Sequence, residues 1–173
     1  MQKVNKMRPT LINISVKGNS IGILFILMTL ICLGACSPKH SSYSEFIEIG
    51  QNAWAKNTGY EFIPQYADSL IEYNVKVAFC FTHEYPYRNM SAIVDFVKKD
   101  SVVVRKIVDF MLTDTNGNWQ IPGFGVAYQS EHFLMPRVKA DNFEKIIVWH
   151  GLDCDTLKNV SKVGITISPN SAN

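Results

Sequence analysis

The sequence predicts an all-β protein whose single domain is an antiparallel β-sandwich or a jelly-roll-like variant of one. Apolar and polar residues alternate over several short segments, turn residues separate these segments, and the chain after residue 36 has no sustained apolar period of 3.6 residues. Strict alternation is typical of strands that place one face in a core. It is clearest over residues 71–81, whose odd-numbered residues are Ile71, Tyr73, Val75, Val77, Phe79 and Phe81.

Further strands are expected where similar alternation returns. Three apolar stripes are predicted to face the core: Met90, Ala92, Val94 and Phe96; Val102, Val104, Val108, Phe110 and Leu112; and Val163, Ile165 and Ile167. Residues 143–149 are apolar on both faces, which favours a strand in the middle of the sandwich. The best candidate for a helical turn is the short segment 153–157.

Turn residues mark the ends of the expected strands. Residues 98–101 separate two of them, and residues 122–125, which read Pro-Gly-Phe-Gly, interrupt a later stretch. Asn116-Gly117 predicts a type I′ turn, because these residue types tolerate positive φ angles. Tyr85-Pro86 lies between two strand segments, and we hypothesise that this bond is cis.

The first 36 residues have the features of a bacterial lipoprotein signal. Basic residues without acidic ones precede an apolar run over residues 21–34, and Leu33-Gly34-Ala35 leads directly to Cys36. The run is too short for a membrane-spanning helix, which needs about 20 apolar residues. We therefore expect cleavage before Cys36 and acylation of that residue, which would hold the protein at a membrane.

These boundaries divide the chain into a lipoprotein signal peptide (1–35), a tether (36–42) and a β-sandwich domain (43–169). Removal of the signal takes away four of the 17 Lys and Arg residues and none of the 15 Asp and Glu residues, so the net charge changes from +2 to −2. A slightly acidic chain argues against a nucleic-acid partner, which requires a clustered basic face.

We predict no catalytic residue, metal site or cofactor in this chain. Cys80 and Cys154 remain after the signal, and they are compatible with a disulfide or with two buried thiols. The four histidines have no spacing that gathers zinc ligands. Residues 114–118 resemble a calcium loop only faintly, because their glycine is in the fourth position and not the sixth, and a hairpin turn is favoured.

Aromatic residues are plentiful and leave two functions open. Most of their side chains are expected to pack in the core or at its corners. Exposed aromatic faces could instead stack on sugar rings, so that a glycan-binding envelope lipoprotein is the alternative to a scaffold. A glycan binder should present a row of coplanar exposed rings flanked by polar donors, whereas a scaffold should present an apolar patch or an open strand edge.

The order of several motifs resembles one known family. Tyr85-Pro86-Tyr87-Arg88-Asn89 follows the long alternating strand, Gly117-Asn118-Trp119 leads into Gly123-Phe124-Gly125, and residues 155–165 close the chain. Together with the cysteine motif, this order is similar to that of the gliding-motility-associated lipoprotein family GldH of Bacteroidetes. The residues that carry the resemblance are Trp54, Tyr85, Pro86, Tyr87, Asn89, Trp119, Gly123 and Gly125.

This resemblance implies a non-enzymatic envelope lipoprotein that acts as a scaffold or assembly component of a gliding-motility or type IX secretion-related apparatus. Its implied partners are the membrane, through acyl chains on Cys36, and other envelope lipoproteins or components of that apparatus. Ser37 resembles signals that direct lipoproteins to the outer membrane. The absence of acidic residues over 37–42 favours the periplasmic face.

The same phylum would also imply O-glycosylation at Asp-Ser or Asp-Thr followed by a methyl-bearing residue. Ser69, Ser101 and Thr156 fit this pattern and are candidate modification sites. The same dipeptides are also ordinary turn and cap residues, so that both interpretations stay open.

Overall fold

The structure, a computed structural model, describes residues 42–66 and 70–170, and this part of the chain is built almost entirely of β-strands. Its strands are β1 (Tyr43–Glu48), β2 (Ala53–Ala55), β3 (Tyr60–Phe62), β4 (Glu72–Thr82), β5 (Asn89–Lys98), β6 (Ser101–Met111), β7 (Gly123–Phe124), β8 (Ala127–Lys139), β9 (Lys145–His150), β10 (Thr156–Lys158) and β11 (Val160–Pro169). The helical elements of this part are two 3-10 turns, η1 (Gly50–Asn52) and η2 (Ala140–Asn142). The predicted all-β class is confirmed.

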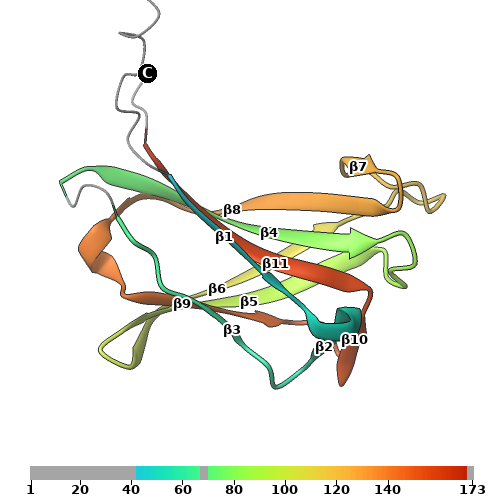
Figure 1. The fold of residues 1–173 in the computed structure, drawn as a ribbon, viewed down its shortest axis with the longest axis horizontal. Coiled ribbons are helices and arrows are strands. Elements are labelled where there is room, and N and C mark those ends of the chain that lie inside the picture. Colours follow the sequence, from blue (N-terminus) through green and yellow to red (C-terminus); the bar gives the residue numbers. More distant parts are fainter. Residues whose placement is uncertain (1–41, 67–69, 171–173) are drawn as a thin grey trace, which may run out of the picture. The chain divides into compact units, whose positions relative to one another are not determined.

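The strands form two facing antiparallel sheets and a short ribbon. One sheet has the order β1-β11-β4-β8-β7, the other has the order β3-β9-β5-β6, and β2 pairs with β10. Figure 1 shows the two larger sheets as two layers, with the β2–β10 ribbon near one end. This arrangement is the sandwich that the alternation predicts.

The core lies between the two layers, where alternation places the apolar side chains. On β4, the five predicted inward residues from Tyr73 to Phe81 are at most 1% exposed. The stripes on β5 and β11 are equally buried, as predicted. Strand β9, which covers most of the segment predicted for the middle of the sandwich, lies between β3 and β5 and buries Ile146 and Val148 completely.

Strand β6 departs from its predicted stripe because it is an edge strand. The later residues of that stripe are partly or fully buried, but Val102 is 51% exposed. A β-bulge adds a residue at Val103, so that Val102 lies opposite Val97 and leaves the register of the inward stripe. The prediction that Val102 faces the core is therefore wrong.

Two turn predictions are also wrong. No peptide bond among the described residues is cis, so the bond between Tyr85 and Pro86 is trans. A turn already closes before the proline, where the N–H of Tyr85 donates to the Thr82 carbonyl at 3.1 Å. At Asn116-Gly117, only Gly117 has a positive φ, +84°, whereas a type I′ turn needs two.

The expected helical turn over 153–157 is absent, because the end of this segment pairs with β2 as strand β10. Leu157 lies opposite Trp54 in the β2–β10 ribbon, and both side chains are completely buried. Packing of an apolar residue against the core overrides the weak local preference for a helix.

Several predictions fall outside the described residues, namely the signal peptide 1–35, the acylation site Cys36 and the candidate glycosylation site Ser69. Across residues 42–66 and 70–170, no helix has the length and apolar character needed to span a bilayer. Cys80 and Cys154 are both free thiols, which decides against the disulfide.

Candidate interaction surface at the loop end

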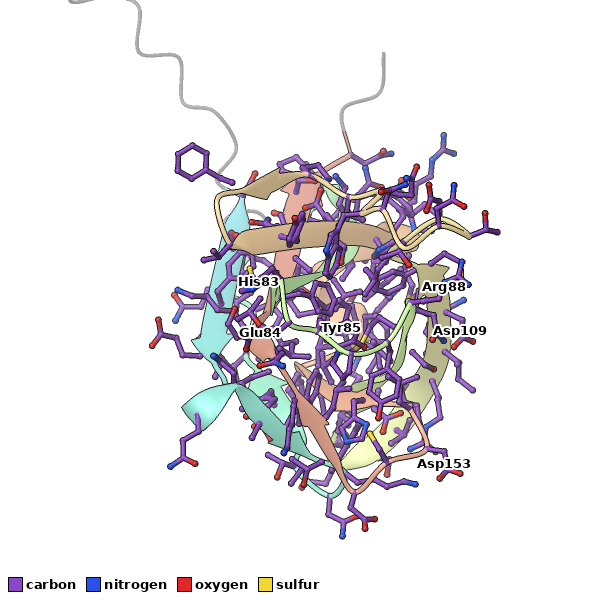
Figure 2. The ribbon with its side chains drawn as sticks, turned by 90° about the vertical axis from the view of Figure 1, so that its right-hand side faces the viewer. His83, Glu84, Tyr85, Arg88, Asp109 and Asp153 are labelled. Carbon is purple, nitrogen blue, oxygen red and sulfur yellow. The ribbon has the colours of Figure 1, made fainter. Side chains whose placement is uncertain are left out.

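Most of the motifs singled out in the sequence meet at one end of the sandwich, which we call the loop end. It consists of residues 83–88, which connect β4 to β5, and residues 112–128, which lead from β6 to the start of β8. Figure 2 shows the β4–β5 connection crossing this end, with Tyr85 near the middle and Arg88 to one side.

Tyr85 closes the core at the loop end. Its side chain is 7% exposed, and its ring meets the Phe81 ring edge-on with centroids 4.7 Å apart. The hydroxyl donates to the Asn89 carbonyl at 3.0 Å. Burial raises the pKa of Tyr85, and the nearby Cys154 and Tyr87 add to this effect, so the phenol stays neutral. Tyr85 therefore has a structural role, and Asn89 contributes its main chain.

Backbone hydrogen bonds fix the β4–β5 connection to the neighbouring turns. The side-chain amide of Asn159 donates to the Glu84 carbonyl at 2.9 Å, and the N–H of Thr82 donates to the Asn159 carbonyl at 3.0 Å. The N–H of His83 donates to the Val126 carbonyl, also at 3.0 Å. The β4–β5 connection is thus held to Val126 of the loop end by a backbone hydrogen bond, and to Asn159 by one backbone and one side-chain hydrogen bond.

Arg88 and Asp114 join the next two loops. The Arg88 guanidinium donates to the Asp114 carbonyl, and the Arg88 carbonyl accepts the N–H of Leu112 at 2.7 Å. The Asp114 carboxylate accepts the N–H groups of Asn116 and Asn118 at 2.8 and 2.9 Å. Hydrogen bonds from the Asn118 side chain and backbone lower the pKa of Asp114 most strongly. The carboxylate shapes the hairpin, which is the role that the sequence favours over a calcium loop.

Trp119, Gly123 and Gly125 shape the β7–β8 hairpin around Tyr128. The Trp119 and Tyr128 rings stack with centroids 4.1 Å apart and planes 10° apart. Gly123 lies opposite Tyr128 in the ladder, and a Cβ there would stand 2.4 Å from Cδ1 of that ring. Gly125 has a φ of +62°, which glycine adopts without strain. The resemblance selects these three residues, and the geometry shows that all three shape the same hairpin.

The β7–β8 hairpin displays two apolar side chains to solvent. Phe124 is 94% exposed and Val126 is 66% exposed. Beside them lies an open pocket of about 340 Å³, lined by Cys80, Pro122, Gly123, Phe124, Ala127, Tyr128 and Gln129. Apolar groups that a hairpin holds exposed to solvent are typical of an interaction surface.

The remaining predicted residues have separate positions. Trp54 is a core residue whose indole N–H donates to the Thr58 carbonyl at 2.8 Å. Pro86 is exposed, and Tyr87 is 38% exposed and contacts Cys154, which raises the pKa of Tyr87 through a hydrogen bond. The structure does not bring Trp54 into the apolar surface.

Sequence reasoning did not single out Phe124, Val126 or Tyr128 as site residues. A signal was present, since Phe124 is a large apolar residue between two glycines in a turn, where it cannot be shielded by its neighbours in the chain. The sequence does not identify Tyr128 as the stacking partner of Trp119. The two residues belong to separate segments, and only the pairing of β7 with β8 brings Tyr128 beside Trp119.

The pKa shifts of cysteine and histidine side chains favour structural roles for these residues. Burial raises the pKa of Cys80, partly opposed by Lys162, so that its thiol stays protonated. Burial also lowers the pKa of His132 and of His150, which keeps both rings neutral near pH 7. Among the residues that the structure describes, no three His, Cys, Asp or Glu side chains converge on a point where a metal ion could bind.

The exposed aromatic rings bear on the choice between a scaffold and a glycan binder. In the described part of the chain, the exposed rings are those of Phe46, Tyr87, Phe124 and Phe133, which belong to four separate segments. The Trp119 and Tyr128 rings cover a face of each other. The ring contacts found in the described residues join no two of these four rings, and the exposed apolar hairpin matches the expectation for a scaffold.

Fold and surface together define a small β-sandwich module that presents an apolar hairpin at one end. The chain matches the family model of the GldH lipoprotein over residues 41–167, and it belongs to this family. It is similar to the gliding motility lipoprotein GldH homolog of Christiangramia forsetii, with 24% identity over 127 residues that cover 73% of this chain and 76% of the relative. The resemblance stated from the sequence is confirmed, and the protein is a gliding-motility-related, membrane-anchored envelope lipoprotein.

Two solved structures from infectious bursal disease virus also align with this chain. The VP2 subviral particle aligns with a TM-score of 0.30 at 11% identity over 78% of this chain, and the Gx strain aligns with a TM-score of 0.28 at 10% identity over 79%. In each case the alignment covers 34% of the viral chain, so that this chain spans about a third of its length.

Proposed function

We propose that this protein is anchored in the outer membrane, faces the periplasm and acts as a non-enzymatic scaffold of a gliding-motility or type IX secretion-related apparatus. Acyl chains on Cys36 hold the domain at the membrane, and the loop end binds an envelope protein. The observation that carries the proposal is the 94% exposure of Phe124 on a hairpin that the Trp119–Tyr128 stack holds in place.

The position of the hairpin supports a docking role. The tether 36–42 enters the domain at Tyr43, which lies opposite Ile167, and Ile167 lies opposite Val75 on β4. The hairpin begins beside Thr82, seven residues further along β4, which is roughly 23 Å at the rise of a strand. The apolar surface is thus remote from the point where the anchor holds the domain, which favours a protein partner over the acyl chains of the bilayer.

The partner should present an apolar side chain that fills the pocket beside Phe124. Full burial of an exposed phenylalanine contributes about 1.5–3 kcal/mol to association, which corresponds to a change in affinity of roughly 10- to 150-fold. A polar substitution at this position should therefore weaken docking strongly without disturbing the core.

The docking role is tested by replacing Phe124 with Asp in the full chain and complementing a strain that lacks the gene. Phe133→Asp is the matched control, because Phe133 is also exposed, at 52%, but lies on β8 beyond the residues that pair with β7. We expect Phe124→Asp to lose gliding or type IX cargo secretion, together with the partner that co-purifies from membranes, and Phe133→Asp to retain them. Equal activity of both variants would contradict the proposal.

The anchor and its side of the membrane are tested separately. Cys36→Ser should release the chain from the membrane fraction, because the acylated residue is lost. The wild-type domain should resist protease added to intact cells, and it should become sensitive once the outer membrane is opened. Digestion on intact cells would overturn the periplasmic assignment.

A further inference from the structure

We propose that β6 of a second copy of this chain pairs with edge strand β6. This pairing joins the four-stranded sheets of the two copies into one continuous antiparallel sheet. The two-fold axis of this dimer passes through the strand pair at Ile107. This surface differs from the loop end, so the inference stands independently of the docking function.

The backbone of β6 offers an unpaired row of hydrogen-bonding groups. Strand β6 is last in the order β3-β9-β5-β6, and the N–H of Leu112, just beyond its end, donates to the Arg88 carbonyl on the β5 side. Backbone groups of successive residues point to opposite sides of a strand. The even-numbered residues therefore bond β5, and Arg105, Ile107 and Asp109 direct their N–H and C=O groups to the open edge. Such an edge is a template for another strand.

Three apolar side chains beside this edge are exposed. Ile107 is 65% exposed, Met111 is 59% exposed and Val103 is 49% exposed. Ile107 lies opposite Ile93, which lies opposite Trp149, so that an apolar row crosses the outer face of the sheet and ends at the edge. A second sheet joined at β6 would continue this row.

The charges on β6 select a second copy of the same strand as the occupant. When antiparallel self-pairing is centred on Ile107, each Arg105 lies opposite an Asp109 and the two Ile107 side chains meet. Centring on Arg105, Lys106 or Asp109 places like charges opposite each other. Centring on Val108 places Arg105 opposite an apolar residue. Opposite charges across a strand pair stabilise it, and like charges destabilise it.

Both charges are available for this contact. None of the ion pairs found among residues 42–66 and 70–170 includes Asp109, which Figure 2 shows at the margin of the molecule. Arg105 donates to the buried Asp95 carboxylate at 2.6 and 2.8 Å, but its side chain is 58% exposed. A guanidinium has five N–H donors, so that Arg105 can bond Asp95 and a partner carboxylate together.

The first experiment measures the mass of the full chain, extracted from membranes in detergent, by analytical ultracentrifugation. Ile107→Pro removes the central edge N–H, and proline is tolerated where the N–H is not bonded within the sheet. Ser44→Pro is the matched control. The N–H of Ile49, just after β1, donates to the Ser161 carbonyl on β11, and by the same alternation Ser44 on β1 faces an open edge of the other sheet. We expect dimers for the wild type and Ser44→Pro, and monomers for Ile107→Pro.

A surface substitution guards against a folding defect in the proline variant. Asp109→Lys places a lysine opposite Arg105 twice in the dimer, and we expect the dissociation constant to rise about tenfold. A wild-type chain that is monomeric at all accessible concentrations would overturn the proposal. This holds even if β6 then proved to bind a different protein. A dimer that persists in folded Ile107→Pro would also overturn it.

Crosslinking tests the register in native membranes. Residues at the two-fold axis would have Cα atoms about 5.5 Å apart, which suits a disulfide. Ile107→Cys should give disulfide-linked dimers under mild oxidation, and Ser44→Cys should not. No crosslink at position 107, or equal crosslinking at both positions, would refute the pairing.

Discussion

Replacing Gly123 with alanine tests whether close packing holds the β7–β8 hairpin. A Cβ at this position would stand 2.4 Å from Cδ1 and 2.6 Å from Cε1 of Tyr128. Carbon atoms attract one another at about 3.5–4.0 Å, so the ring must move by about 1 Å. The ring cannot move by that much and keep its stack on Trp119, whose centroid is 4.1 Å away.

Overpacking of this kind costs about 1–3 kcal/mol, whereas a Gly-to-Ala change at an unstrained, open position stabilises by about 0.4–1 kcal/mol. We therefore expect Gly123→Ala to lower the free energy of unfolding by about 1–3 kcal/mol, which lowers Tm by roughly 4 °C per kcal/mol. Calorimetry measures this loss, and near-ultraviolet circular dichroism reports the Trp119 stack.

Gly50→Ala provides the control for Gly123→Ala. A Cβ on residue 50 would meet no atom within 4 Å, and its backbone does not need a positive φ. We expect this variant to melt at or slightly above the temperature of the wild type. If Gly123→Ala melted like Gly50→Ala, with an unchanged dichroism spectrum, the packing argument for the hairpin would be wrong.

Two further predictions concern protonation and modification. Burial lowers the pKa of His150 in the folded state, so the unfolded chain binds more protons as the pH falls. The stability from neutral His150 is fully present above the unfolded pKa of about 6.5 and is lost as the pH drops toward the lower folded pKa. His150→Phe should therefore reduce the fall in denaturation midpoint between about pH 7.5 and 5.5, and an unchanged dependence of the midpoint on pH would contradict this. Ser101 and Thr156 are exposed, so we expect a glycan on at least one candidate site. When Ser69, Ser101 and Thr156 are all replaced by alanine, the intact mass of the native protein should fall by more than the three substitutions account for, and a native mass without any glycan would refute the expectation.

Alternation predicted the core of β4, β5 and β11 because each of these strands has neighbours on both sides and a facing sheet, so that inward residues are fully covered. The same rule failed at Val102, because burial at an edge depends on strand order and on a bulge that involves β5. Neither is a property of the local segment. The type I′ turn predicted at Asn116-Gly117 is wrong for a local reason, since the Asp114 carboxylate binds the loop N–H groups and favours a different turn.

The candidate site was predictable in part. The resemblance selected Tyr85, Trp119 and Gly123, and the structure assigns each of them a packing task. It could not select Phe124 as the exposed element, because exposure depends on how the hairpin lies over β8. The open edge of β6 could not be predicted from the sequence either, because a strand with neighbours on both sides would show the same alternation.

The two proposed surfaces and the anchor are compatible in one geometry. The β5–β6 turn lies at the end of the domain where β1 begins, because Lys98 donates to the Asp141 carbonyl just after β8, and the loop end lies at the other end of β6. Antiparallel pairing at Ile107 therefore sends the two loop ends in opposite directions. If the predicted tether 36–42 holds each copy, both copies can attach to the same membrane when the two-fold axis is normal to it.

In this orientation the strands of the dimer run along the membrane, and an apolar hairpin stands free at each end. Anchored copies share a thin layer, and this confinement raises their effective concentration and favours the pair. The anchor would thus control how many hairpins act together. Release of the chain by Cys36→Ser should therefore shift β6 pairing toward monomers at equal expression, whereas Phe124→Asp should leave the pairing unchanged.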